Sequence, residues 1–595
     1  MKLITYGFLV LSLLTTGCFK GHQEEALLTY HGILKDDVKT WDPASAYDEI
    51  SVDLVPNVFE TLYQYKYLSE EFQLEPLLAT QMPVYSKDRL TVKIPIRHGI
   101  YFQDDPCFKA TQGKGREVKA QDFIYGIKRL ALPSLQSQGW WTVDGKIVGM
   151  SAFHKKLTNA KKEDRPKIFE EPIEGLKAID DYTLQIKLTK PYPALAYILV
   201  MTFTSPVARE AIEAYADENG NVMDHPVGTG AFKLLSWERN HEIVLEKNPN
   251  YHEDHYPNQA SPFFRSRGYL RDAGKKLPFL ERLSFQVIKE DQPRWLNFMK
   301  GKVDSTLIPK DNFGQAITED KKLRPELGVK GVQLMTESGV TIRYVTFNVA
   351  DPILGANKLL RQALSSSIDR EEWISVFTNN TGVKMGGLVP FGVADRPKTS
   401  TIKYDFDLKR AKELLAKAGY PDGKGLPVLR FDLRGASTTD RQIGEFFSNQ
   451  FEQIGVKVEV IPNTFPAFLE KWKHGDLQIS YGGWIMDYPD AENIYQLLYG
   501  SNKSPGPGDA NFDSLEYNKL YEKMAVLSPG LARSRLIQKL DDIAQEECPL
   551  ALGYYEARYD LAHPWVENYR PSLMLANKYK YFKVNKKVKE KALQN

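Results

Sequence analysis

The side chains that could carry out chemistry in this sequence are few and widely separated. Its 595 residues contain no Gly-x-Ser-x-Gly elbow, no His-Glu-x-x-His pair and no P-loop, which are signatures of serine hydrolases, zinc peptidases and nucleotide-binding enzymes. One histidine cluster remains, His252 with His255, and a solvated surface loop is a better interpretation of it than a zinc or nickel site. We therefore expect a protein that is not an enzyme, with no catalytic residues, no metal and no cofactor.

The three cysteines offer little redox chemistry. Cys107 and Cys548 are far apart in the sequence, and two unpaired, half-buried thiols are a better interpretation than a disulfide. Cys18 differs because it closes an export signal, in which a basic residue, a largely apolar stretch at 3–14 and small residues come before the cysteine. The stretch is too short for a transmembrane helix, which needs about 20 residues.

The ending Thr-Thr-Gly-Cys at 15–18 resembles a bacterial lipobox, with a threonine where leucine is usual. It implies that residues 1–17 are a cleaved signal peptide, that Cys18 is lipidated and that residues 18–24 are a lipidated tether. We expect a protein of the periplasm or the cell surface, anchored to a membrane. The alternative is an ordinary signal peptide with a chance cysteine. In Gram-negative lipoproteins, an aspartate directly after the lipidated cysteine resembles an inner-membrane retention signal. This chain has Phe19 at that position, so the choice between inner and outer membrane stays open.

The composition is that of an ordinary globular chain. Hydrophobic residues make up 42% and charged residues 26%, and no second apolar run is long enough to span a membrane. The net charge is +2, and the one single-sign run is a basic tail at 586–595, so the chain has no concentrated basic face for nucleic acid. Aromatic residues reach 12%, which suits a binding cleft, although core packing accounts for most of them.

The elements that must position these residues alternate irregularly between strand and helix patterns, without a repeat of fixed period. This predicts a mixed α/β fold. Residues 89–97 and 181–188 alternate polar and apolar positions, as half-buried strands do. Residues 119–130 place apolar side chains at helical spacing. Residues 407–419 predict a helix that begins after an aspartate N-cap and ends at a glycine.

Seven short landmarks follow one another along the chain. They are residues 40–44, 57–62, 96–104, 118–125, the pair 228–232 and 247–251, the pair 361–365 and 368–370, and residues 483–490. In this order they resemble the extracellular solute-binding proteins of the oligopeptide and dipeptide ABC importers, known as family 5. Each fragment alone could occur by chance, but the common order over most of the chain carries the resemblance.

The resemblance implies an α/β, three-lobed periplasmic-binding-protein fold, class II and cluster C-like, with a ligand cleft between lobes I and III. Lobe I would take residues 25–60, 175–285 and 550–585, lobe II residues 61–174, and lobe III residues 286–549. Hinges would lie near Val287 and Pro549, because two chain crossings between rigid lobes permit rotation about one axis. Ligand contacts on both lobes would stabilise the closed form, which the importer would recognise.

The resemblance also implies a site for a peptide ammonium. An ammonium buried in a closed cleft needs an anionic partner. In peptide-binding relatives an aspartate just after a tryptophan supplies it, and Asp487 after Trp484 matches; a turn residue before Tyr488 is the local alternative, and Asp490 is the other candidate carboxylate. The main chain of the peptide could be added as a strand. The implied ligand-binding residues are Ala46, Tyr47, Asp48, Tyr481, Gly482, Gly483, Trp484, Asp487 and Tyr488.

Gly482 and Gly483 would allow the ligand chain to approach closely. Ala46 to Asp48 match positions where relatives contact the peptide, and a polar loop is an equally good interpretation of them. Tyr481 and Trp472 stand where the best-known oligopeptide binders carry arginines for the peptide carboxylate, so the C-terminal anchor stays open.

We therefore expect a monomeric substrate-binding lipoprotein of an ABC importer. It would capture oligopeptides by lobe closure and deliver them to permease subunits in the inner membrane. Two alternatives remain: a binder of another small solute, such as a nickel chelate, haem or a sugar, and a ligand-sensing receptor that does not transport.

Overall fold

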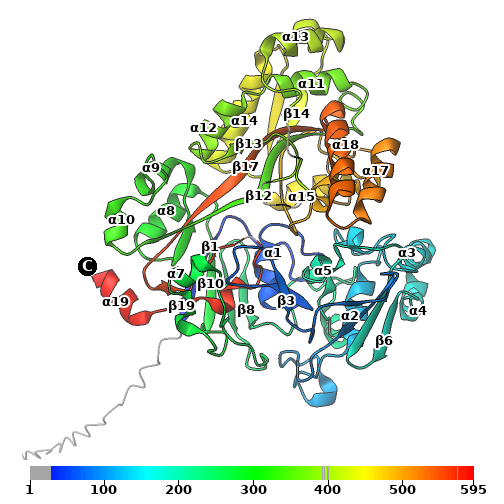
Figure 1. Ribbon diagram of the computed structural model, residues 1–595, viewed down its shortest axis with the longest axis vertical. Helices are drawn as coiled ribbons and strands as arrows, with labels where there is room; N and C mark the ends of the chain where they lie inside the picture. Colours follow the sequence, from blue (N-terminus) through cyan, green and yellow to red (C-terminus); the bar gives the residue numbers. More distant parts are fainter. Residues whose placement is uncertain (1–27, 391–392, 394, 398–400, 573, 595) are drawn as a thin grey trace, which may run out of the picture.

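The computed structural model describes residues 28–390, 393, 395–397, 401–572 and 574–594 (Figure 1). The predicted signal peptide, Cys18 and the predicted tether lie outside this described part. Within it, no helix combines the length and apolar character needed to cross a membrane. The chain forms one lobe at the top of Figure 1 and two lobes below it.

Lobe I, at the lower left of Figure 1, is built on a sheet of order β1-β10-β9-β8, in which β1 and β10 are parallel and the other pairs antiparallel. Its elements are β1 (Thr29–Leu34), α1 (Ser51–Leu54), β2 (Tyr63–Tyr65), β3 (Leu74–Pro76), β8 (Phe232–Glu238), β9 (Glu242–Lys247), α7 (Pro262–Ser266), β10 (Arg282–Val287), β18 (Val566–Glu567) and β19 (Lys583–Val584). Leu245 and Phe285 from the sheet share one core with Tyr579 and Phe582, so the end of the chain completes this lobe.

Lobe II, at the lower right, holds the antiparallel sheet β4-β5-β7-β6. Its elements are β4 (Val84–Tyr85), β5 (Thr91–Pro95), α2 (Ala120–Arg129), α3 (Met150–Asn159), α4 (Arg165–Glu170), β6 (Leu176–Asp180), β7 (Thr183–Lys187), α5 (Leu195–Ile198) and α6 (Arg209–Tyr215). The strands predicted at 89–97 and 181–188 and the helix predicted at 119–130 are confirmed by β5, β7 and α2.

The boundary predicted between residues 174 and 175 would divide this sheet. β6 and β7 were expected in lobe I, but β7 pairs with β5 along its whole length and β6 pairs with β7. Leu184 and Ile186 of β7 are buried in the lobe II core. Strand pairing therefore extends lobe II to residue 187, and Leu188, Leu195 and Phe203 belong to the same core.

Residues 288–332 form a small segment of their own between lobes I and III. It contains α8 (Asp291–Met299), β11 (Ser305–Leu307), α9 (Phe313–Ala316) and α10 (Pro325–Val329). The segment is bound to lobe I, because the Tyr30 hydroxyl lies 2.5 Å from Ser305 Oγ and the His31 N–H donates to Asp304 at 2.7 Å.

Lobe III, at the top, is built on a mixed sheet of order β11-β17-β12-β16-β14-β15, with β13 beside β17. Its elements are β12 (Gln333–Phe347), α11 (Lys358–Ser366), α12 (Arg370–Thr378), β13 (Val383–Lys384), α13 (Leu408–Lys417), β14 (Leu429–Leu433), α14 (Thr438–Glu452), β15 (Val458–Pro462), α15 (Phe465–His474), β16 (Ile479–Ile485), α16 (Glu492–Tyr495), α17 (Leu515–Ala525), α18 (Leu531–Glu547) and β17 (Leu550–Ala562). The helix predicted at 407–419 is confirmed, since Asp407 accepts the Arg410 N–H at 2.9 Å as the N-cap of α13.

The long strands β12 and β17 run side by side from lobe III down to lobe I (Figure 1). Their register shifts between Ser338 and Thr341, and the core changes there: Val340 packs in the lobe I core, whereas Ile342 packs in the lobe III core. The change from the lobe I core to the lobe III core therefore lies within β12 and β17, away from the crossings predicted near Val287 and Pro549: Ala562 of β17 packs in the lobe I core and Tyr555 in the lobe III core.

Most of the basic tail forms the helix α19 (Lys586–Gln594). No residue of this helix is buried, but Lys589 reaches the fully buried carboxylate of Asp304, with Nζ 2.7 Å from Oδ1. The tail is therefore tied to the body of the protein.

Candidate ligand-binding site

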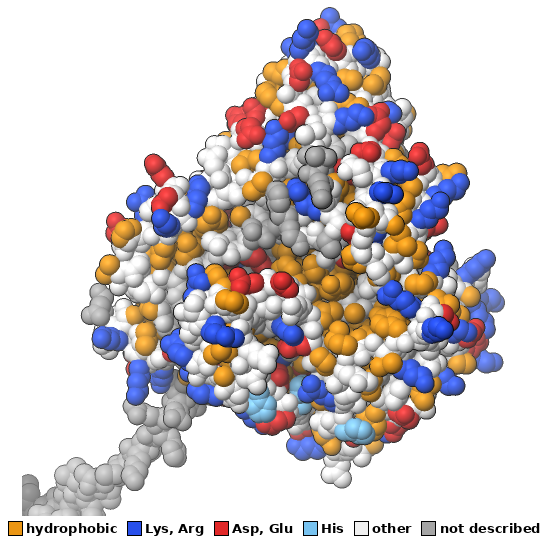
Figure 2. Space-filling view, in the orientation of Figure 1, with side chains coloured by type: hydrophobic (Ala, Val, Ile, Leu, Met, Phe, Trp, Pro, Cys, Tyr) orange, Lys and Arg blue, Asp and Glu red, His pale blue; other side chains and the backbone are white. Residues whose placement is uncertain are grey.

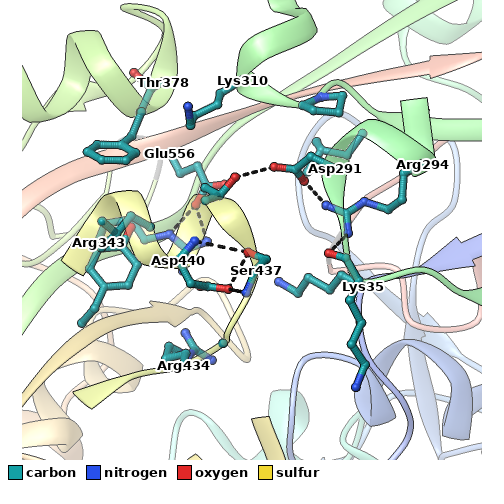
Figure 3. A pocket seen from close by; sticks show the side chains of 18 of the residues that line it. Lys35, Asp291, Arg294, Lys310, Arg343, Thr378, Arg434, Ser437, Asp440 and Glu556 are labelled. Atoms are coloured by element: carbon teal, nitrogen blue, oxygen red, sulfur yellow. Dashed lines mark hydrogen bonds and ion pairs between the residues drawn. The ribbon is translucent and has the colours of Figure 1, made fainter. Parts of the chain in front are cut away.

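Two neighbouring cavities lie between the lobes: one is lined by residues of all three lobes, and the other by lobe I, residues 289–313 and lobe III. We call the smaller one, of about 160 Å³, the apolar pocket, and the larger one, of about 420 Å³, the charged chamber. Glu49, Arg434 and Phe465 line both cavities and so stand at the boundary between them. Figure 2 shows apolar side chains gathered below lobe III, with charged side chains around them. Figure 3 shows the charged chamber from close by.

Asp487 lies in the wall of the apolar pocket, two residues after the end of β16. Its Oδ2 accepts hydrogen bonds from the Tyr47 hydroxyl at 2.9 Å and from Asn493 Nδ2 at 2.7 Å. Among the described residues no group donates to Oδ1, and no cation lies within ion-pair distance. Burial raises the pKa of Asp487 to about 7, and the two hydrogen bonds offset only part of that effect. A cationic ligand group would supply the missing charge.

Asn493 in α16 holds this carboxylate in place. It is fully buried, and its Oδ1 accepts both the Asp487 N–H and the Trp484 indole N–H at 3.0 Å. One amide therefore fixes the two residues that the sequence singled out. Sequence reasoning missed Asn493, because a buried asparagine six positions after an aspartate forms no recognisable pattern.

Tyr47 brings all three lobes together. Its ring centroid lies 5.1 Å from that of Phe203 in lobe II and 6.0 Å from that of Trp484 in lobe III. Ala46 and Asp48 line the same pocket. The Asp48 carboxylate accepts the Ile50 N–H at 3.1 Å and the Ser51 N–H at 2.9 Å, so it is used at the start of α1.

The strand β16 offers an open edge to the cleft. On one side it pairs with β12 along its whole length, but on the other side β14 pairs only with Ile479 and Ser480. In the described chain no strand covers the second edge from Tyr481 to Ile485. Its main-chain groups can therefore pair with an extended ligand.

The two glycines of β16 are explained by packing within the sheet. A Cβ at Gly482 would lie 2.8 Å from the Tyr344 ring, and a Cβ at Gly483 would lie 2.8 Å from a guanidinium nitrogen of Arg343. Gly483 lines the apolar pocket, whereas Gly482 lines neither cavity. The room that they make is used by side chains of β12, and the expected role in ligand approach stays a prediction.

The other predicted residues are divided by the structure. Tyr481 lines the charged chamber. Tyr488 lines neither cavity: it is fully buried in the lobe II core and stacks on Tyr197, with ring centroids 5.7 Å apart. Asp490, the other candidate carboxylate, forms a buried ion pair with Arg533. Asp487 is therefore the better candidate of the two.

Arg434, directly after β14, is a cation that sequence reasoning missed. The chamber is lined by six cations, and five of them have a carboxylate partner: Lys35 with Glu49, Lys289 with Asp36, Arg294 with Asp291, Lys310 with Asp311 and Arg343 with Glu556. Figure 3 labels the pairs of Arg294 and Arg343. Arg434 has none among the described residues, and its guanidinium lies 5.4 Å from the Phe465 ring centroid. A lone arginine after a strand carries no sequence signal, so only the fold reveals it.

Of the described residues, the histidines and cysteines singled out in the sequence lie outside both cavities. His252 is buried, with Nε2 3.0 Å from Glu60, and His255 pairs with Glu253 at the surface. No group of three or more metal-ligating side chains occurs in the described part of the chain. Cys107 and Cys548 are both buried and free.

Comparison with known proteins identifies the family of the chain. A sequence model of the bacterial extracellular solute-binding proteins, family 5, matches residues 73–506. The oligopeptide-binding protein OppA of Bacillus subtilis is 24% identical over 531 residues, 88% of this chain and 86% of that protein. Heme-binding protein A of Haemophilus influenzae is 22% identical over 515 residues, 86% and 84% of the two chains.

Solved structures share the fold as well. The periplasmic binding protein DppA of Helicobacter pylori, in complex with the peptide STSA, superposes with a TM-score of 0.74 at 22% identity. The match covers 94% of this chain and 98% of that one. The three-lobed fold is therefore common to both.

Proposed function

Because the chain belongs to the bacterial extracellular solute-binding proteins of family 5, we propose that it is the substrate-binding component of an ABC importer and captures short peptides by lobe closure. The family consists of solute-binding proteins and not of enzymes. Permease subunits in the membrane are the partners that this function requires. The closed cleft would be the form that they recognise.

One observation carries the proposal: an acidic and a basic side chain, Asp487 and Arg434, line the same apolar pocket, and neither has an ion-pair partner among the described residues. The free edge of β16 adjoins the pocket. A peptide with free termini supplies an ammonium, a carboxylate and main-chain groups in one molecule. Each terminus would form a charge-assisted hydrogen bond in a site shielded from water.

We further propose that Cys18 carries a lipid and that the protein is held at a membrane, in the periplasm or at the cell surface. Support comes from the export signal and the lipobox-like ending at 15–18. A tethered binder stays at a high effective concentration near its importer.

The test begins with the ligand that the protein carries. Mass spectrometry of small molecules released by denaturing the purified protein should find short peptides. Calorimetric titration should then give binding for a tripeptide with free termini and none for hemin, nickel chelates or sugars. Saturable binding of one of those solutes, with no heat from any peptide, would overturn the proposal. Relatives include a haem-binding protein, so hemin is the most informative of these competitors.

A further inference from the structure

The positions of the two charged anchors set the direction of a bound peptide. An ammonium at Asp487 places the first residue beside the end of β16, next to Trp484 and Met486. The main chain then follows the open edge of β16 toward Tyr481, which lines the charged chamber. The first side chain and the later side chains therefore meet different walls.

Each lobe contributes apolar side chains to the wall at the first residue. Lobe I contributes Tyr47, lobe II contributes Val200, Met201 and Phe203, and lobe III contributes Leu469, while Met574 completes the wall from the end of the chain. These side chains come from elements far apart in the sequence, so the apolar character results from lobe closure.

The charged side chains that line this pocket already have a partner or would bind a peptide terminus. Asp48 accepts main-chain N–H groups at the start of α1, and Glu49 pairs with Lys35 at 2.7 Å. Asp487 and Arg434 would hold the two termini of the peptide. A charged first side chain would consequently be buried without a partner, which is strongly unfavourable.

The wall changes beyond Tyr481. The charged chamber is lined by ion pairs. In one of them, Arg343 Nε lies 2.6 Å from Glu556 Oε2. Polar side chains at later positions can keep water and hydrogen bonds in this larger cavity. The structure thus separates one selective position from positions that accept many side chains.

We propose that the protein selects peptides whose first residue carries a bulky apolar side chain, such as leucine or phenylalanine, and is tolerant at later residues. This inference rests on the proposed function, because it needs the ammonium at Asp487. It goes further by naming the class of peptide and the wall that selects it.

Titration calorimetry with two series of tripeptides tests the selectivity. In the series X-Ala-Ala, we expect peptides that begin with leucine or phenylalanine to bind about 10- to 150-fold more tightly than those that begin with serine or lysine. This range is the free energy of burying a large apolar side chain, converted to a ratio of affinities at about 1.4 kcal/mol per tenfold. In the series Ala-Ala-X, we expect no such preference. Equal affinities across the first series, or a preference for serine or lysine, would overturn the inference while the proposed function stands. If no peptide binds, both fall.

A variant with altered pocket charge gives a second measurement. Val52 lines the apolar pocket and its side chain is 36% exposed, so Val52→Glu adds a carboxylate without emptying the core. We expect Lys-Ala-Ala to gain at least tenfold relative to Leu-Ala-Ala. Val84→Glu is the matched control, because Val84 is 50% exposed in β4 and lines neither cavity. An unchanged ratio in Val52→Glu would contradict the assigned position of the first side chain.

Discussion

Replacing Asp487 by asparagine removes one charge and preserves the shape of the side chain, whose oxygen can still accept from Tyr47 and Asn493. In the wild type the buried carboxylate would pair with the ammonium of a peptide. Breaking a buried pair by removing one partner costs about 3–5 kcal/mol, which corresponds to a loss of about 10² to 10⁴ in affinity. An N-acetylated peptide has no charge to lose, so its weak binding should stay the same in the variant.

The same carboxylate should make binding dependent on pH. Burial raises the pKa of Asp487 to about 7, so in the closed, empty cleft the group is protonated below that pH. An ammonium ligand stabilises the ionised form and lowers the pKa, and binding then releases a proton. Affinity should be full above pH 7 and should fall about tenfold for each unit below it, giving about a hundredfold loss at pH 5.

Titration calorimetry of Leu-Ala-Ala and its N-acetylated form between pH 5 and 8 measures both effects. Buffers with different ionisation enthalpies report the number of protons released. Asp487→Asn should abolish the pH dependence, whereas Asp88→Asn, a matched change at the exposed surface of lobe II, should leave it intact. A flat pH profile for the wild type, or equal losses for the free and acetylated peptides in Asp487→Asn, would refute this account of the site.

Three further predictions concern other groups. Arg434→Gln should weaken binding of peptides with a free carboxylate by about 10- to 100-fold, as expected for a hydrogen bond to a charged group, and leave C-amidated peptides unaffected in calorimetry; equal losses for both would exclude the carboxylate role. Burial lowers the pKa of His252, but the charge of the neighbouring Glu60 outweighs this and raises it overall, so the pair stabilises the fold fully below about pH 6.5 and less as the pH rises through the folded-state pKa. In thermal unfolding, the melting temperature of His252→Gln should therefore lie below that of the wild type at pH 6, and the two should converge at pH 9. A difference in melting temperature that stays constant with pH would contradict the assignment. Cys18→Ser should move the protein from the membrane fraction to the supernatant after cell lysis, and unchanged membrane recovery would rule out the lipid anchor.

Features that depend on local periodicity could be predicted from the sequence. The strand β5 and the helix α13 follow from alternation and capping. Asp487 is indicated by the family resemblance around Trp484; the structure places both residues in the wall of one pocket, and the ligand role of Asp487 stays a prediction. The boundaries between lobes could not be predicted from local sequence patterns. β7 alternates like any half-buried strand, and only its pairing with β5 assigns it to lobe II.

The missed parts of the site share one physical cause. Arg434 is unusual because it has no carboxylate partner among the described residues. Asn493 is unusual because its side-chain amide accepts hydrogen bonds from both Trp484 and Asp487. Tyr488 looked like a ligand contact, but it is inserted into the core of another lobe. Such properties arise from tertiary packing between distant segments, and single-sequence patterns do not encode them.

The insertion of Tyr488 into lobe II has a consequence for the lifetime of the bound state. Withdrawing lobe III would expose this ring together with the faces of Trp141 and Tyr197 that cover it. Burial of a side chain of this size is worth about 1.5–3 kcal/mol, a contribution that would favour the closed cleft even without a ligand. If the protein captures solutes by lobe closure as proposed, we expect this buried ring to slow the release of a bound solute, because opening the cleft must extract it.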